Sequence, residues 1–172
     1  MKLKIILLVT VSAIIFYLLE SNNDEQASID LSNNPQFVIT KFSQINTDKQ
    51  GKYSSMILGD KLHSFGGQKN TEITNPIVIL KKTQPVTMSA KLGILKADIL
   101  SLSNDVVVTQ TSSQLITNSL EIELETSIAT TFDDIQLYDV NSKTSATGAR
   151  IDSNNNLITL FSNVKTIYHP PK

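Results

Sequence analysis

The sequence contains no cysteine and no tryptophan, and only two of its 172 residues are histidine. Without cysteine the chain cannot form a disulfide, a thiolate metal site, a cysteine nucleophile or a lipidated N-terminal cysteine. This absence does not fix the compartment, because oxidising compartments also hold proteins without disulfides. The formal net charge is -1, from 15 basic and 16 acidic residues. No basic patch is available to neutralise phosphates, so we expect no nucleic-acid partner.

Patterns of catalytic residues are also scarce. His63 and His169 have no neighbouring nucleophile or carboxylate pattern, and the sequence has no nucleophile elbow. The pair Gly66-Gly67 is not followed by the Lys-Ser/Thr of a phosphate-binding loop. The pair Asp133-Asp134 lacks the spaced oxygens of a calcium loop and is interpreted as a turn. We therefore expect no catalytic residues, no metal site and no cofactor, and we predict that the protein is not an enzyme.

The first residues form an apolar run between charges. Lys2 and Lys4 precede the uncharged residues 5–19, and Glu20 follows them. As a helix this run spans roughly 22 Å, which fits a signal peptide, whereas counting from Met1 gives a length that spans a bilayer. No small-x-small pair closes the run, which favours an uncleaved single-pass anchor over residues 1–19 with a cytoplasmic N-terminus. A cleaved signal peptide stays as the alternative.

The remaining chain divides by composition. Residues 20–36 are polar, acidic and rich in turn formers, which predicts a linker. Residues 37–168 are long enough for one domain with a substantial core, and residues 169–172 form a short tail.

The clearest pattern in the domain lies at residues 118–126. Three apolar residues alternate there with three glutamates: Leu120, Ile122 and Leu124 with Glu121, Glu123 and Glu125. Successive side chains of a strand point to opposite faces, so this segment predicts a strand with one buried face and one acidic, solvated face. A row of three glutamates could bind a metal only with help from another strand, and a solvated face is the better interpretation.

Strands separated by turns are expected throughout the domain, and no segment after the N-terminal run shows a helical period. The expected strands are residues 37–46, 53–58 with an extension to 63, 71–74, 77–80, 86–91, 99–109, 115–126, 135–140 and 157–168. Residues 128–131 are ambiguous, and residues 141–145 are expected to be a loop. This spacing predicts an all-β sandwich, jelly roll or related open barrel.

A weak internal repeat links residues 99–106 to residues 157–164. At a constant offset of 58, Leu102 corresponds to Leu160 and Val106 to Val164. The pattern indicates either a repeated strand unit or a chance likeness between two hairpins.

A sheet with an apolar face and no catalytic pattern has two possible uses. The two layers can seal the face as an ordinary core, or they can separate and expose a groove for acyl chains. The sequence alone does not separate these alternatives.

Taken in order, several segments resemble the lipopolysaccharide export protein family LptC. They follow the N-terminal anchor and linker as Gly51-Lys-Tyr-Ser-Ser-Met-Ile-Leu58, Thr74-Asn-Pro76, Met88-Ser-Ala-Lys91, Asp98-Ile-Leu-Ser-Leu102, Asn104-Asp-Val-Val-Val108, Ile116-Thr-Asn-Ser-Leu-Glu-Ile122, Asp134-Ile-Gln-Leu-Tyr138 and Leu160-Phe-Ser-Asn-Val-Lys-Thr166. The chain departs from the family at Ser103 or Asn104 and at Asp139, where the family commonly has glycine. These departures bear on partner docking more than on the fold.

The resemblance implies a periplasmic β-jelly roll, an open taco-like stack of antiparallel sheets, carried by one inner-membrane helix. It implies that the protein accepts lipopolysaccharide from an ABC transporter complex of LptB, LptF and LptG. It also implies that the lipid is passed to the periplasmic bridge protein LptA toward the outer membrane, by joining of open sheet edges. Residues 157–168 are the expected edge for that partner.

The resemblance places acyl chains between the sheets, on one parity of each strand. The expected lipid-binding residues are Phe42, Ile57, Ile73, Met88, Ala90, Leu102, Val106, Leu120, Ile122, Leu124, Ile135, Leu137, Ile158, Leu160 and Tyr168. The same parity adds Val108 and Val164, and with less support Ile77 and Ile79. The alternatives are a membrane-tethered structural or adhesion domain with a sealed core and, third, an anchored hydrolase.

Overall fold

The structure is a computed structural model that describes residues 35–47, 50–65, 70–81 and 84–169. All of them belong to one compact unit, Ser32–Lys172. The predicted anchor (residues 1–19) and residues 20–34 of the predicted linker lie outside the described residues. Among the residues that are described, no helix has the length and apolar character needed to cross a bilayer.

The described chain is built from strands. They are β1 (Pro35–Thr47), β2 (Tyr53–Phe65), β3 (Asn70–Thr74), β4 (Ile77–Leu80), β5 (Val86–Ser89), β6 (Leu92–Lys96), β7 (Ile99–Gln110), β8 (Ser113–Glu123), β9 (Ile128–Asp139), β10 (Ser142–Asp152) and β11 (Leu157–Tyr168). The β-branched and apolar residues of these segments favour extended backbone, and several connections contain turn formers such as Gly51, Asn141 and the run Asn154-Asn-Asn156.

The strands follow one another as an antiparallel meander. β2 pairs with β4 along its first half and with β3 along its second half. β7 pairs in the same way with β6 and β5. Backbone bonds from Asn75 N to Lys91 O (2.9 Å) and from Ala90 N to Pro76 O (3.2 Å) bridge the two breaks. β3 with β4, and β5 with β6, therefore each act as one long strand that is bent in the middle.

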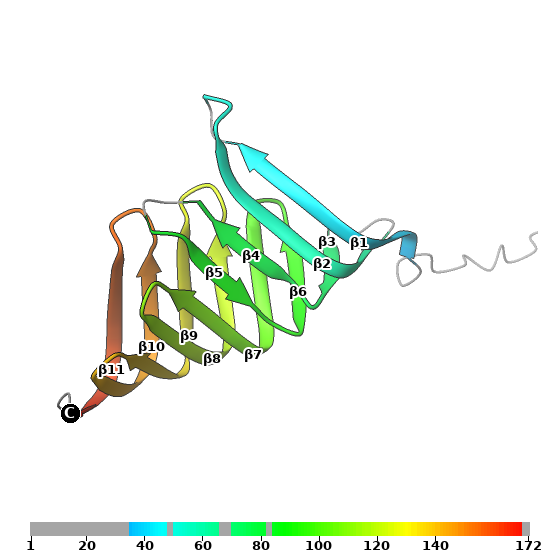
Figure 1. Cartoon of the computed structure of the whole chain (residues 1–172). Coiled ribbons are helices and arrows are strands. Elements are labelled where there is room, and N and C mark those ends of the chain that lie inside the picture. Colours follow the sequence, from blue (N-terminus) through cyan, green and yellow to red (C-terminus); the bar gives the residue numbers. More distant parts are fainter. Residues whose placement is uncertain (1–34, 48–49, 66–69, 82–83, 170–172) are drawn as a thin grey trace, which may run out of the picture. The chain divides into compact units, whose positions relative to one another are not determined.

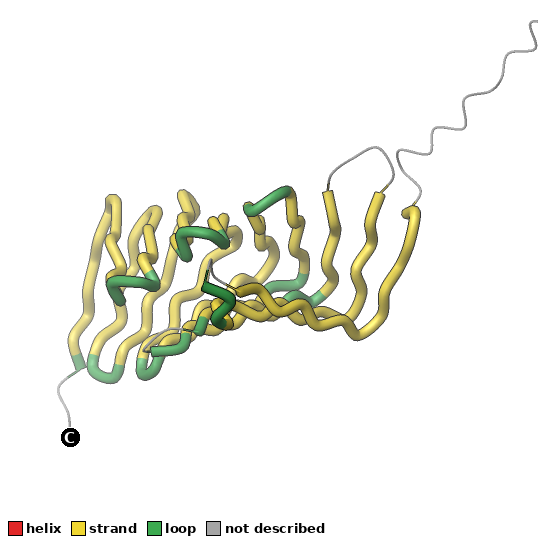
Figure 2. The backbone as a smooth tube through the Cα atoms, turned by 90° about the horizontal axis from the view of Figure 1, so that it is seen from above, coloured by secondary structure: helices red, strands yellow, loops and turns green. Residues whose placement is uncertain are grey.

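The bends line up across the sheet, and we call this line the crease. The regular pairing of β7 with β8, of β8 with β9 and of β9 with β10 is interrupted there. Several residues along the crease have left-handed backbone, a conformation that residues other than glycine adopt only at an energetic cost. They are Lys41, Asn75, Asn104, Asp105, Gly148 and Asn163. The crease folds the sheet into two layers, one containing β4 and β5 and the other containing β3 and β6 (Figure 1; Figure 2).

Polar side chains lie along the crease. Lys91 forms an ion pair with Asp105, and Asn75 Nδ2 donates to Asp60 Oδ2 at 2.8 Å. Another bond runs from Ser119 Oγ to Asp133 Oδ2 at 2.6 Å. These bonds satisfy polar groups where the regular ladder is interrupted, which lowers the cost of the bend.

Apolar side chains of both layers pack together to form the core. In the β4–β5 layer the fully buried side chains include Ile57 on β2, Val78 and Leu80 on β4, and Met88 on β5. The β3–β6 layer contributes a matching set: Ile73, Leu100, Leu102, Leu120, Ile122 and Ile151. One face of each strand packs in this core and the other faces solvent. The alternation of apolar and polar residues in the sequence therefore corresponds to the inside and outside of the folded sheet.

The predicted alternation is correct at residues 118–123. Leu120 and Ile122 are 2% and 0% exposed, while Glu121 and Glu123 face solvent. The strand ends at Glu123, however, so the prediction that it continues to Thr126 is wrong. Leu124 packs against the core from the following turn.

Two other predictions of local structure are wrong. The segment Ile128–Asp139 is one continuous strand, and Asp133-Asp134 lies at its bend and not in a turn. Residues 141–145, expected as a loop, mostly belong to β10, which the sequence analysis did not anticipate. Apart from Ile151, the inward row of β10 consists of small residues such as Ala146 and Ala149, which give no hydrophobic signal.

The strand β6 was also not predicted, and the parity of β4 was assigned incorrectly. Val78 and Leu80 are fully buried, whereas Ile77 is 41% exposed and Ile79 is only partly buried. All four residues of this strand are large and apolar, so alternation gives no signal from which the inward pair can be chosen.

Candidate functional site

The expected lipid-binding residues form one apolar interior between the two layers. Eight of them are buried: Ile57, Ile73, Met88, Leu102, Val106, Leu120, Ile122 and Ile135. Others are partly buried and pack against that core: Phe42, Ala90, Leu124, Leu137, Ile158 and Leu160. Tyr168 differs from the rest because it is 64% exposed at the end of β11. The structure therefore brings together the residues of one parity, and whether they contact lipid stays a prediction.

The β1 end of this interior is closed by an aromatic ring. Phe42 lies over Gly59, where a Cβ atom would come within 2.6 Å of both the Phe42 ring and the Ile73 methyl group. Further along the same strand pair, Asn46 Nδ2 donates to Ser55 Oγ at 3.0 Å, and Ser55 is buried. Gly59 thus provides the space in which Phe42 covers the core.

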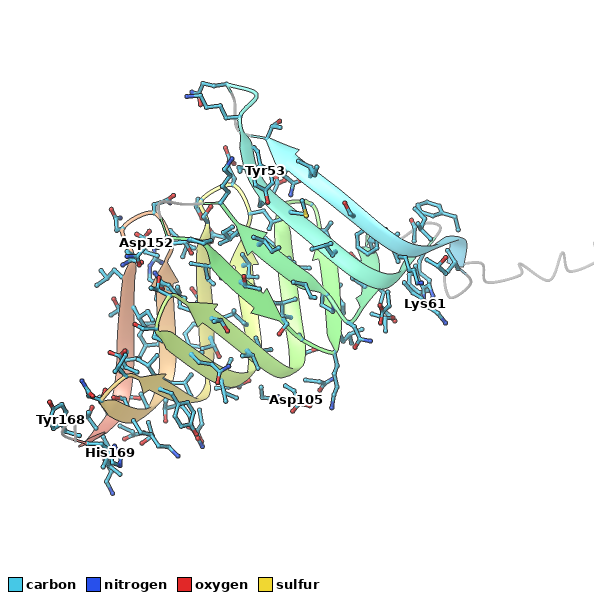
Figure 3. All side chains as sticks on the ribbon, viewed as in Figure 1. Tyr53, Lys61, Asp105, Asp152, Tyr168 and His169 are labelled. Carbon is cyan, nitrogen blue, oxygen red and sulfur yellow. The ribbon has the colours of Figure 1, made fainter. Side chains whose placement is uncertain are left out.

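The β11 end is more open. β11 pairs only with β10 among the described strands, so its other edge is free. Register pairs Ile158 with Ile151 and Leu160 with Ala149, which places Ile158 and Leu160 on the inward side. Beyond the crease, Val164 is 53% exposed, and Tyr168 lies at the far end of the strand (Figure 3).

A hollow of 950 Å³ opens between the layers on the side opposite the crease, where the hairpin turns lie, and we call this side the mouth. Residues around β1 and β2 and residues of the other layer both contribute; the lining includes Ile45, Tyr53, Lys81, Leu95, Leu124 and Ser127. The Lys81 ammonium lies 5.0 Å from the centroid of the Tyr53 ring, a cation–π distance. Asp98 and Glu125 also line the hollow, so the mouth combines apolar, cationic and acidic groups beside the apolar interior.

A second hollow of 630 Å³ lies at the crease, with Asp105, Asn118, Asp134 and Asn163 in its lining. Asp105 raises the pKa of Lys91 there, first through their hydrogen bond and then through its charge. Among the described residues, no three His, Asp or Glu side chains gather where they could hold a metal ion.

Several notable polar groups were not anticipated from the sequence. Thr117 and Thr131 are buried at the crease with their hydroxyl oxygens 3.3 Å apart. Ser153 is 4% exposed, and its hydroxyl has no hydrogen-bond partner among the described residues. Single hydroxyls in a chain rich in Ser and Thr have no distinguishing pattern, so no sequence signal could have selected these residues.

Comparison with known proteins agrees with this architecture. Among solved structures, the fold is similar to LptH, the LptA-homologous periplasmic component of the lipopolysaccharide transport device of Pseudomonas aeruginosa. The TM-score is 0.51 at 6% identity, over 78% of this chain and 94% of that chain, so the likeness concerns the fold alone. A search of curated proteins gives no match.

The family comparison covers nearly the whole sequence. The model of the family described as "Lipopolysaccharide-assembly, LptC-related" matches residues 5–169. This agrees with the ordered segments from Gly51 to Thr166 and with the LptA-like jelly-roll fold. The family functions in lipopolysaccharide transport and is not a family of enzymes. The chain therefore belongs to the LptC-related family of lipopolysaccharide-assembly proteins.

Proposed function

We propose that this protein carries lipopolysaccharide between its two layers, accepting it from an ABC transporter complex and passing it to LptA. The observation that supports this best is the continuous apolar interior, which runs from Phe42 on β1 to Leu160 on the free edge strand β11. Each buried CH₂ group of an acyl chain contributes about 0.8 kcal/mol, so such an interior can hold a lipid without any polar anchor.

The proposed setting is the inner membrane, with residues 1–19 as a single-pass anchor and the β domain in the periplasm. LptB, LptF and LptG form the proposed transporter complex. β11 is the proposed docking edge for LptA, because strand addition needs a free row of backbone donors and acceptors. The apolar residues of β11 that lie open to solvent, including Phe161 and Val164, suit a partner that extends both faces of the sheet.

A sealed structural domain is the alternative, and one observation favours it. Ile57, Val78, Leu80 and Met88 have no exposed surface, so in this conformation their part of the interior is filled by the protein itself. A lipid can enter there only if the two layers separate and side chains are displaced.

Photo-crosslinking distinguishes the two functions. A photoreactive residue is placed at Ile122 or Leu160 in the full chain in detergent, and purified lipopolysaccharide is added. Glu123 is the matched control, because it lies next to Ile122 on the same strand but faces solvent. Adducts at Ile122 and Leu160 without adducts at Glu123 support the carrier. A folded protein that gives no adduct at any of the three positions supports the sealed domain.

A further inference from the structure

Ser153 is a buried polar residue without a partner. It is the first residue after β10 and follows Ala149 and Ile151 at alternating positions; like them it is buried (4% exposed), which places its side chain on the same inward side. Its backbone N–H is satisfied by Ser127 O at 3.2 Å, but its Oγ atom has no partner among the described residues. Buried hydroxyls are nearly always hydrogen-bonded, and an unsatisfied one in a folded protein calls for an explanation.

Small side chains lie among the buried residues near Ser153, beside the large Ile151. Ala129 pairs with Ile151, and Thr131 pairs with Ala149 in the adjacent register positions. Most of the largest fully buried side chains come instead from strands between β2 and β8. Less apolar side-chain volume therefore has to be displaced beside β9 and β10 than elsewhere in the interior.

This region also connects to the open side of the molecule. Ser127, which accepts the backbone bond of Ser153, lines the 950 Å³ hollow at the mouth. That volume lies within the usual range for small-ligand sites, about 300–1,000 Å³. Leu95 and Leu124 supply apolar surface in the same hollow.

We propose that the Ser127–Ser153 corner of the mouth binds the linkage region of an acylated lipid, with the Ser153 hydroxyl donating a hydrogen bond to the ester or amide carbonyl oxygen. The acyl chain then runs inward past Ala129 and Ala149, whose side chains are small. This inference rests on the proposed lipid-carrier function and adds to it a specific polar contact. Lipopolysaccharide and phospholipids both present acyl carbonyls, so the ligand chemistry is an acyl linkage and the test separates the two sources.

The test compares lipids with and without the carbonyl. Affinities of the full chain in detergent are measured for purified lipopolysaccharide, for diacyl phosphatidylglycerol and for its dialkyl ether analogue. Ser153→Ala is the test variant. Ser55→Ala is the control, because Ser55 is equally buried but its hydroxyl already accepts a bond from Asn46. Unfolding midpoints are recorded for every variant.

We expect Ser153→Ala to weaken lipopolysaccharide binding about threefold to tenfold, the range for one hydrogen bond. Its stability should equal or exceed that of the wild type, since an unsatisfied buried hydroxyl is removed. Ser55→Ala should lose stability and keep its affinity within about twofold. If Ser153→Ala also weakens the binding of phosphatidylglycerol but not that of its ether analogue, the acyl-linkage site is supported. Phospholipid is then a second source of the acyl ligand.

Two results overturn the inference while the carrier function stands. In the first, lipopolysaccharide crosslinks at Ile122, but Ser153→Ala binds lipopolysaccharide with the same affinity as the wild type. The other is a wild-type protein that binds ester and ether phospholipids equally tightly, a comparison that does not depend on any variant. Absence of both crosslinking and lipid binding overturns the carrier function and this inference together.

Discussion

The ring of Phe161 on β11 occupies the position where a side chain at Gly148 on β10 would lie. A Cβ atom at Gly148 would come within 2.5 Å of Phe161 Cδ2, and the backbone there has φ +76°. We therefore predict that Gly148→Ala destabilises the protein by about 1–3 kcal/mol, because both left-handed strain and the ring contact oppose it. Urea unfolding monitored by circular dichroism measures this change.

The double variant separates the two causes. In a Phe161→Ala background the ring contact is gone, so Gly148→Ala should cost only the backbone strain and the contact with Thr131 O at 3.3 Å, about 1–2 kcal/mol. If Gly148→Ala costs no stability relative to its own parent protein, in either background, Gly148 does not adopt the left-handed backbone on which this prediction rests.

Gly59 gives a second prediction, in which only packing is involved. Its Cβ would meet Phe42 and Ile73 at 2.6 Å, and we expect Gly59→Ala to cost about 1–3 kcal/mol through overpacking. Phe42→Leu should recover part of this loss. Gly51 is the matched control, because no atom lies within 4 Å of its Cβ position and only its φ of +75° opposes substitution. A Gly59→Ala variant that is as stable as the wild type in the same unfolding assay would contradict the close packing of Phe42.

Strand positions and inward parity could be predicted wherever large apolar and polar residues alternate. Leu120 with Ile122 and Leu102 with Val106 are examples, and the structure buries all four. Alternation fails where every residue is apolar, as in β4, and where the inward residues are small, as in β10. In both cases the side chains do not differ enough in hydrophobicity to mark a face.

The crease could not be predicted, although the internal repeat contained a trace of it. The repeat superimposes residues 99–106 on residues 157–164, and in both segments the chain crosses from one layer to the other. The left-handed residues Asp105 and Asn163 correspond at the same offset of 58. Asn and Asp tolerate left-handed backbone, but they also occur in ordinary turns, so their presence alone does not distinguish a bend within a strand from its end.

Asp152 leads to a prediction about acid stability. The side-chain amide of Asn155 donates to its carboxylate at 2.8 Å and, with the Asn155 backbone N–H, lowers the pKa of Asp152 below its ordinary value of 3.8. A lowered pKa means that this contribution to stability is present above about pH 4 and is lost as the pH falls through the folded pKa. Thermal unfolding of the wild type and of Asp152→Asn between pH 7 and pH 2.5 should show a wild-type advantage that disappears at the acid end. A constant difference across this range would show that ionisation of Asp152 plays no part.

Val164 tests the proposed docking edge. It lies on the inward side of β11 beyond the crease and is 53% exposed, so Val164→Lys should change the free energy of unfolding by less than about 0.5 kcal/mol. An added strand from LptA would bury the lysine charge between the layers, and inward-pointing charges on edge strands oppose such pairing. Titration of LptA against the full-length protein should therefore show a loss of affinity of at least about tenfold. Val140→Lys is the control, since Val140 is 73% exposed in the turn after β9 and does not belong to the edge strand β11. If LptA binds Val164→Lys as tightly as it binds the control, the partner docks elsewhere, and β1, the other strand with a free edge, becomes the position to test.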